Sequence, residues 1–289
     1  MALSLRQIRR RIKSVENTKK ITRAMEMVAA AKLKRLQGLL AESDRYGEEL
    51  RRMLTNLLKG RAVTHPLLQK REEEKRILAF LITSDTGLCG SYNTNMISKA
   101  AQFIEEAGKQ KLISFVAIGK NGAAFLKRTN QTLAKEIAIP RPQQIDETIA
   151  LITQIATDAF IKNETDEVIF LYTRVQTLSI LRPESTRLLP LGESGADRDN
   201  VPMDYIIEPD LDRVLGRLLP EFIESNIGKF VKHSLVSEQA SRMTAMRQAT
   251  DNAKEMIDSL TLARNKARQA SITKELIEVV SGSRALQMQ

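Results

Sequence analysis

The sequence predicts an α/β protein in which two long terminal helices pair as an antiparallel coiled coil, with a separate domain between them. Two observations lead to this fold class. Both ends of the chain are free of helix breakers over long distances, since residues 1–59 and 221–289 contain no proline. Between these ends, short apolar runs alternate with helical segments, which is typical of a largely parallel sheet.

The C-terminal stretch, residues 221–289, predicts one continuous helix of roughly 100 Å at about 1.5 Å per residue. Its apolar or small residues follow a 3-4 repeat, which is the seam of a coiled coil. The seam is slim, because alanine and threonine stand where leucine is expected: Met243, Met246, Thr250, Ala253, Ile257, Leu260, Arg264 and Ala267. We therefore expect a long helix that needs a partner but fills no thick core.

The N-terminal stretch can supply that partner. Its helical stripe consists of Leu5, Ile8, Ile12, Val15, Ile21, Met25, Val28, Ala29, Leu36, Leu39 and Leu40. Two helices at opposite ends of one chain favour an antiparallel pair. The alternative is two helices of an ordinary bundle, which seldom run this long without caps. A proline inside such a helix would bend it, and we expect none.

The central segment has a different period. Apolar runs at residues 77–82, 112–118 and 167–172 predict buried parallel strands. Helices are expected over about 93–107, behind Gly119 and over 145–161, and residues 177–190 can add an edge strand. Asp210 is expected to cap the final helix. The predicted domains are therefore residues 1–60, a central α/β domain at 61–209, and residues 210–289.

Charge is concentrated in the first helix. Residues 1–60 carry 15 Lys and Arg against 6 Asp and Glu, which is +9 of the chain's net charge of +10. Such a helix favours an acidic partner surface, although on charge alone a solvated charged face is the simpler explanation. We expect no membrane span and no signal peptide, because no apolar run is long enough. The single cysteine excludes an internal disulfide and fits a reducing compartment.

Motifs for catalysis are few. The Gly-Lys pairs at 108–109, 119–120 and 228–229 lack the rest of a P-loop, and His65 and His233 lack metal-ligand spacing to Cys89. The turn Gly87–Gly90 could cradle a phosphate or hold a reactive thiol, or it could simply be a tight turn with a small buried thiol. Nucleic-acid binding is disfavoured, since Tyr46 is the only aromatic residue in the basic helix. We predict no catalytic, cofactor or metal site.

Three longer motifs resemble one family. Residues 21–32 (ITRAMEMVAAAK), 84–90 (SDTGLCG) and 265–276 (NKARQASITKEL) occur in this order, and Val280–Gly282 follows the last. They resemble the N-terminal, central and C-terminal signatures of the gamma subunit of F-type ATP synthases. The resemblance covers essentially the whole chain.

The resemblance implies a rotor shaft without nucleotide chemistry of its own. In this family a coiled coil stands inside a ring of alpha and beta subunits, and a central Rossmann-like α/β domain sits at the foot with the epsilon subunit and the membrane c ring. The ring contacts implied are Met25, Lys32, Arg35, Arg242, Arg268, Gln269, Thr273 and Glu275. The foot contacts implied are Tyr205 and Glu208.

The sequence also departs from the family pattern. Thr86 stands where arginine is usual, Ser91 where glycine is usual, and the tip reads Ser283-Arg284 instead of small residues. The cysteine pair of the chloroplast form is missing, so we expect no redox switch. With no transit peptide, we expect a bacterial protein at the cytoplasmic face of the inner membrane, held there only through the complex. The alternatives are a nucleotide-binding enzyme and a basic scaffold on nucleic acid.

Overall fold

The computed structural model describes residues 5–58, 63, 65–71, 75–108, 110–178, 180–191, 207–208 and 210–287. In chain order the elements are α1 (Leu5–Leu58), β1 (Arg76–Ile82), α2 (Tyr92–Ala107), β2 (Leu112–Ile118), α3 (Lys120–Arg128), β3 (Thr132–Ile137), α4 (Ile145–Ile161), β4 (Glu167–Thr177), β5 (Ile180–Leu189) and α5 (Leu211–Gln287).

These elements form two compact units. One contains Met1–Ala29 and Met243–Gln289, and the other contains Ala30–Arg242. The predicted domain borders at residues 60 and 210 lie close to the helix ends. They stay a prediction, because the unit around the sheet also takes in residues 30–58 of α1 and 211–242 of α5.

The central sheet has five strands in the order β3-β2-β1-β4-β5. The first four are parallel, and β5 pairs antiparallel with β4. This confirms the predicted parallel strands and the edge strand. We did not predict β3, because its side chains are mostly exposed and Lys135 and Glu136 interrupt any apolar run.

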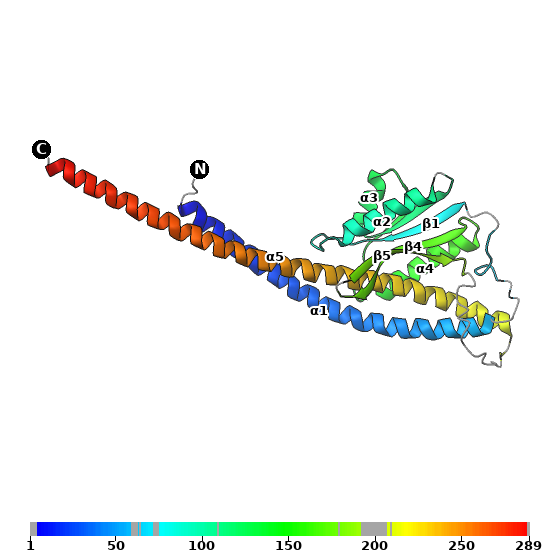
Figure 1. Cartoon of the computed structure of the whole chain (residues 1–289). Coiled ribbons are helices and arrows are strands. Elements are labelled where there is room, and N and C mark those ends of the chain that lie inside the picture. Colours follow the sequence, from blue (N-terminus) through cyan, green and yellow to red (C-terminus); the bar gives the residue numbers. More distant parts are fainter. Residues whose placement is uncertain are drawn as a thin grey trace. The chain divides into compact units, whose positions relative to one another are not determined.

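The two faces of the sheet have different covers (Figure 1). One face packs against α2 and α3 around Leu81, Met96 and Phe115. The other face packs against α4 and α5, where Phe80 stacks on Phe170 at 4.5 Å between ring centroids. Phe230 of α5 then lies 5.2 Å from Phe170 and 4.6 Å from Tyr172 of β4. The final helix is therefore part of the core of the α/β body.

The two long helices are antiparallel, as predicted. Contacts within the two units pair Thr22 with Thr250, Asp44 with Lys229, and Tyr46 with Glu221. The position on α5 falls as the position on α1 rises, which is the mark of an antiparallel pair.

The seam of the coiled coil is largely as predicted. On α5, Met246, Thr250 and Ala253 are buried, and the other members as far as Ala267 are half-buried. On α1, however, Ile21 and Val28 are 60% and 56% exposed. Their assignment to the stripe was wrong, because Thr22 and Ala29 hold the 3-4 register one residue further along.

A proline does lie inside one long helix, contrary to expectation. Asp210 caps α5, since its Oδ1 accepts the Arg213 N–H at 2.8 Å. The helix then continues through Pro220. Proline removes the hydrogen bond to the carbonyl four residues earlier and crowds it. That residue is Gly216, and both positions are exposed, so the carbonyl that loses its bond faces solvent.

Candidate functional site

The C-terminal part of α5 is an exposed surface. Beyond Ala267, every side chain that the structure describes on this helix is exposed. Within its own unit, α5 continues past the start of α1 (Figure 1). Its apolar side chains there, Ile272, Leu276, Ile277, Val279 and Val280, are 49–70% exposed. A contiguous exposed apolar surface of this kind marks a binding site for another protein.

Four predicted ring contacts lie on this exposed segment. Thr273 Oγ1 donates to the Gln269 carbonyl at 2.9 Å, and Glu275 accepts from Ser271 at 3.1 Å. The Arg268 guanidinium makes no hydrogen bond or ion pair to the rest of the described chain. The segment therefore offers a mixture of apolar contact area and available polar groups.

The predicted contacts near the N-terminus occupy one side of α1. At about 100° per residue, Met25, Lys32 and Arg35 fall within about 80° of one another. Lys32 and Arg35 are exposed, and Met25 is half-buried beside the seam. The neighbouring Ile21 and Val28 add exposed apolar area. In the unit of residues 30–242, α1 therefore presents the positive charges of Lys32 and Arg35, which suit an acidic protein surface.

Arg242 is placed differently from the other predicted contacts. It is only 8% exposed, and its Nη1 lies 2.5 Å from Glu238 Oε1. Its Nη2 donates to Thr86 Oγ1 at 3.0 Å and to the carbonyls of Thr86 and Gly87 at 3.3 Å each. In the isolated chain this side chain therefore fastens α5 to the turn after β1. Its contact with the ring stays a prediction.

Three serines extend this attachment. Ser234 Oγ accepts the Thr173 N–H at 3.3 Å, and Ser237 Oγ donates to the Thr173 carbonyl at 3.0 Å. Ser241 Oγ donates to the Cys89 carbonyl at 2.6 Å. We call Ser234, Ser237, Glu238, Ser241 and Arg242 the junction. Of these residues only Arg242 was predicted as a contact, although small polar residues recurring every three or four positions were a usable signal.

The turn that the junction holds is tight and buried at its base. Cys89 is 2% exposed, and its Sγ accepts from Asn93 Nδ2 at 3.3 Å. Asp85 binds the N-terminus of α3 through the Lys120 N–H at 2.9 Å. Leu88 stands out from the turn, 60% exposed and with φ of 63°. These contacts favour the interpretation as a tight turn with a small buried thiol, and disfavour a phosphate cradle.

The junction occupies the place where sheets of this topology bind ligands. The chain runs from β1 outward to β2 and β3 and then returns to β4 on the other side, so β1 and β4 flank the switch point. Thr173 lies just beyond the paired end of β1 and β4. The helix α5 therefore fills this crevice with the chain's own side chains.

His233 gives the junction region a pH dependence. Its Nδ1 accepts the Val175 N–H at 3.3 Å, and its Nε2 lies 3.9 Å from Asp44 Oδ1. Burial lowers the pKa of His233 from 6.5 to about 4; Asp44 opposes this, whereas Lys229 and Arg174 add to it.

We expect His233 to destabilise the chain as the pH falls from about 6.5 toward 4. Over this range the unfolded chain binds a proton that the folded chain rejects, at a cost of up to about 3 kcal/mol. In thermal unfolding, the stability of the wild type relative to His233→Gln should fall as the pH is lowered. A wild-type to His233→Gln difference that is constant from pH 7 to 4.5 would refute the assignment.

The predicted foot contacts are only partly visible. Glu208 is exposed and precedes α5. Tyr205 lies outside the described residues, as does the segment around it. No helix in the described ranges is long and apolar enough to cross a membrane.

The geometry defines a class of protein: paired long antiparallel helices, one of which packs into an α/β body and has an exposed C-terminal segment. A family model described as ATP synthase matches residues 4–286. The ATP synthase gamma chain of Herpetosiphon aurantiacus is 40% identical, covering 98% of this chain and 99% of that one. That of Symbiobacterium thermophilum is 39% identical, covering 99% and 100%. The chain belongs to the ATP synthase gamma chain family.

Solved structures agree with this fold. A chain of the Euglena gracilis mitochondrial ATP synthase, from an OSCP/F1/c-ring structure in rotational state 3, matches with a TM-score of 0.70 and 19% identity, over 98% of this chain and 94% of that one. A chain of the Tetrahymena thermophila central stalk and c ring matches with a TM-score of 0.59 and 23% identity, over 79% and 99%.

Proposed function

We propose that this chain is the central-stalk rotor subunit of an F-type ATP synthase. It transmits torque between the membrane c ring and the catalytic alpha/beta ring, couples ion translocation to ATP synthesis or hydrolysis, and regulates ATPase activity. The observation that carries the proposal is the exposed apolar and polar surface of α5 beyond Ala267, which a lone chain would not leave uncovered. The relatives' shared description as ATP synthase gamma chains supports it.

The proposed partners are those that the family resemblance implies, and two exposed regions of the chain support them. The far end of α5, with Arg268, Gln269, Thr273 and Glu275, contacts the alpha and beta subunits. The basic side of α1, with Met25, Lys32 and Arg35, faces acidic loops of the ring. Glu208 and Tyr205 belong to the foot, beside the epsilon subunit and the c ring. The chain reaches the cytoplasmic face of the bacterial inner membrane as a peripheral component, through the complex alone.

The proposed mechanism needs no chemistry from this chain. Individual exposed ion pairs are weak, about 0–1 kcal/mol, so several can form and break at each rotational step. The orientation of the shaft then biases each catalytic subunit among its conformations, as an effector biases an equilibrium. Nucleotide hydrolysis by the chain itself is disfavoured, because α5 fills the crevice at the switch point with its own side chains.

Reconstitution tests the proposed function. The isolated chain is assayed for nucleotide binding and ATP hydrolysis and is then mixed with alpha and beta subunits of the same organism. We expect an inactive chain, and a mixture that assembles and hydrolyses ATP far faster than alpha and beta without it. Hydrolysis by the chain alone, or failure to join the ring, would refute the proposal.

The contact set at the end of α5 has its own test. Replacing Arg268 and Gln269 together by alanine should lower ATP turnover of the assembled complex about tenfold, because two contacts of about 0.5–1 kcal/mol each are lost. Both side chains are exposed, so the melting temperature should not change. Lys266→Ala, about 160° around the helix from Arg268, is the matched control. Unchanged turnover in the double variant would remove these residues from the contact set.

A further inference from the structure

The long helices differ in how they meet the α/β body. Within the unit of residues 30–242, α5 is bound by polar contacts to the main chain of the body. The junction reaches the backbone of Thr86, Gly87, Cys89 and Thr173. Beside it, Phe230 of α5 packs against Phe170 and Tyr172 of the sheet. Main-chain partners fix the helix in position more firmly than exposed side chains would.

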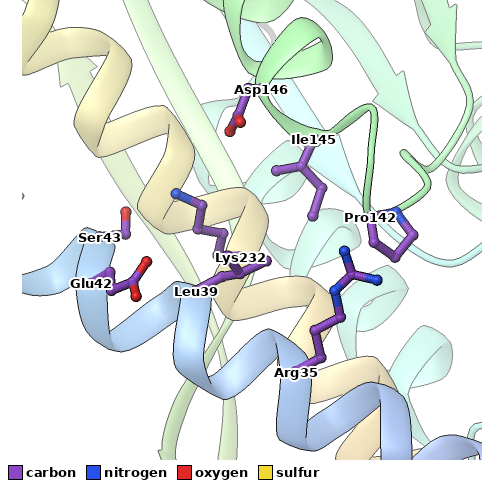
Figure 2. A pocket seen from close by; sticks show the side chains of 8 residues that line it. All are labelled: Arg35, Leu39, Glu42, Ser43, Pro142, Ile145, Asp146 and Lys232. Atoms are coloured by element: carbon purple, nitrogen blue, oxygen red, sulfur yellow. The ribbon is translucent and has the colours of Figure 1, made fainter.

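The other helix faces the body across a cavity of about 250 Å³ (Figure 2). Arg35, Glu42 and Ser43 of α1 line it, with Asp146 at the start of α4 and Lys232 of α5. In the described structure none of these five polar side chains makes a hydrogen bond or an ion pair. Between residues 30 and 50, no side chain of α1 makes a hydrogen bond or ion pair to the described part of residues 76–191.

Residues 30–50 of α1 are instead tied to α5. Asp44 lies 3.2 Å from Lys229 Nζ, and Tyr46 donates to Glu221 at 3.2 Å. Several apolar seam residues of this segment, such as Leu36 and Leu40, are buried as well. In this unit α1 is therefore held by the neighbouring helix, with an open, polar-lined space between itself and α4.

We propose that torque passes between the α/β body and the shaft through α5 at the junction, and that residues 30–50 of α1 follow only through their contacts with α5. The cavity is a compliant space in which α1 shifts against α4 without breaking bonds. The inference rests on the proposed rotor function, because torque has a meaning only there. The asymmetry of attachment, however, is a property of the isolated chain and can be measured without the complex.

The test compares two sets of substitutions in the full chain. Ser237→Ala with Ser241→Ala removes two junction hydrogen bonds and leaves good helix formers in place. The matched control, Glu42→Gln with Ser43→Ala and Asp146→Asn, changes three polar groups around the cavity. Amide hydrogen exchange of the isolated chain should quicken about tenfold at residues 84–90 and 234–242 in the junction variant. The control should exchange like the wild type.

The same variants are then placed in the complete synthase. In the junction variant, ATP hydrolysis should stay within about twofold of the wild type, while ions pumped per ATP hydrolysed should fall about threefold or more, since hydrolysis needs only the ring contacts. The control should keep both values. The inference is overturned if junction exchange is unchanged, if the junction variant pumps at the wild-type ratio, or if the control loses pumping equally. If the wild-type chain itself supports no pumping, the rotor function fails, and the exchange comparison still decides where the body is attached.

Discussion

A Gly119→Ala chain is expected to lose its folded α/β body. Gly119 follows β2 with φ of +103°, a backbone conformation that residues other than glycine rarely adopt. A Cβ atom there would lie 2.4 Å from the Thr83 carbonyl oxygen and 2.8 Å from Thr83 Oγ1. Thr83 cannot yield, because its own N–H binds the Ile118 carbonyl at 2.8 Å. We expect a loss of at least about 4 kcal/mol, a large share of the stability of an ordinary domain.

Denaturant unfolding of the isolated chain measures this loss. Gly38→Ala is the control, because a Cβ at this position in α1 meets nothing within 4 Å. Alanine is favoured over glycine inside a helix, so Gly38→Ala should stabilise the chain by about 0.5–1 kcal/mol. A Gly119→Ala chain within about 1 kcal/mol of the wild type would show that the close approach of β2 to Thr83 is dispensable.

Removing the Arg242 charge should have a comparable effect. Arg242→Met leaves Glu238 buried, 6% exposed, without its cation. Breaking such a buried pair costs about 3–5 kcal/mol, because one charge remains uncompensated. The double variant Glu238→Gln with Arg242→Met should recover most of the loss, since no buried charge is left. Arg247→Met, at an exposed position of the same helix, should change stability by less than about 0.5 kcal/mol.

The loss should also depend on pH in a defined direction. Burial already raises the pKa of Glu238 above its ordinary value, and Arg242 opposes that rise. Without Arg242 the folded pKa rises further, so the folded state prefers the protonated carboxyl. The Arg242→Met chain should therefore be closest to the wild type at low pH and lose stability as pH rises above about 4.5. Unfolding curves at pH 5 and pH 8 would contradict this if the deficit were equal at both.

Much of this fold could be predicted from the periodicity of apolar residues. The runs in β1, β2 and β4 are long enough to mark buried parallel strands, and α4 begins and ends where its pattern does. The helix α5 kept its 3-4 repeat from Met243 to Ala267. These signals are local, and burial enforces them. The edge strand β3 has no such burial and left no pattern to find.

The attachment of α5 could not be predicted in the same way. Ser237 and Ser241 bind main-chain carbonyls more than 60 and 150 residues away, and nothing in the sequence of either partner marks the pairing. The position of Arg242 on the helix could be predicted, but its partners could not. It binds the main-chain carbonyl of Thr86 as well as the Thr86 hydroxyl, and a main-chain partner has no sequence signal. Ile21 and Val28 were misplaced because the buried 3-4 repeat of α1 runs through the polar Thr22 and the small Ala29, while their larger apolar neighbours are exposed.

The packing of Phe230 and the junction into the sheet imposes an order on the synthesis of this protein. The strands leave the ribosome long before residues 230–242 do, so the face formed by Phe170 and Tyr172 stays uncovered while the chain grows. At about 5–20 residues per second the wait lasts several seconds. The core of the α/β body is thus completed only when α5, the last helix to be synthesised, packs onto the sheet. Truncation before residue 230 would release a half-covered sheet prone to aggregation.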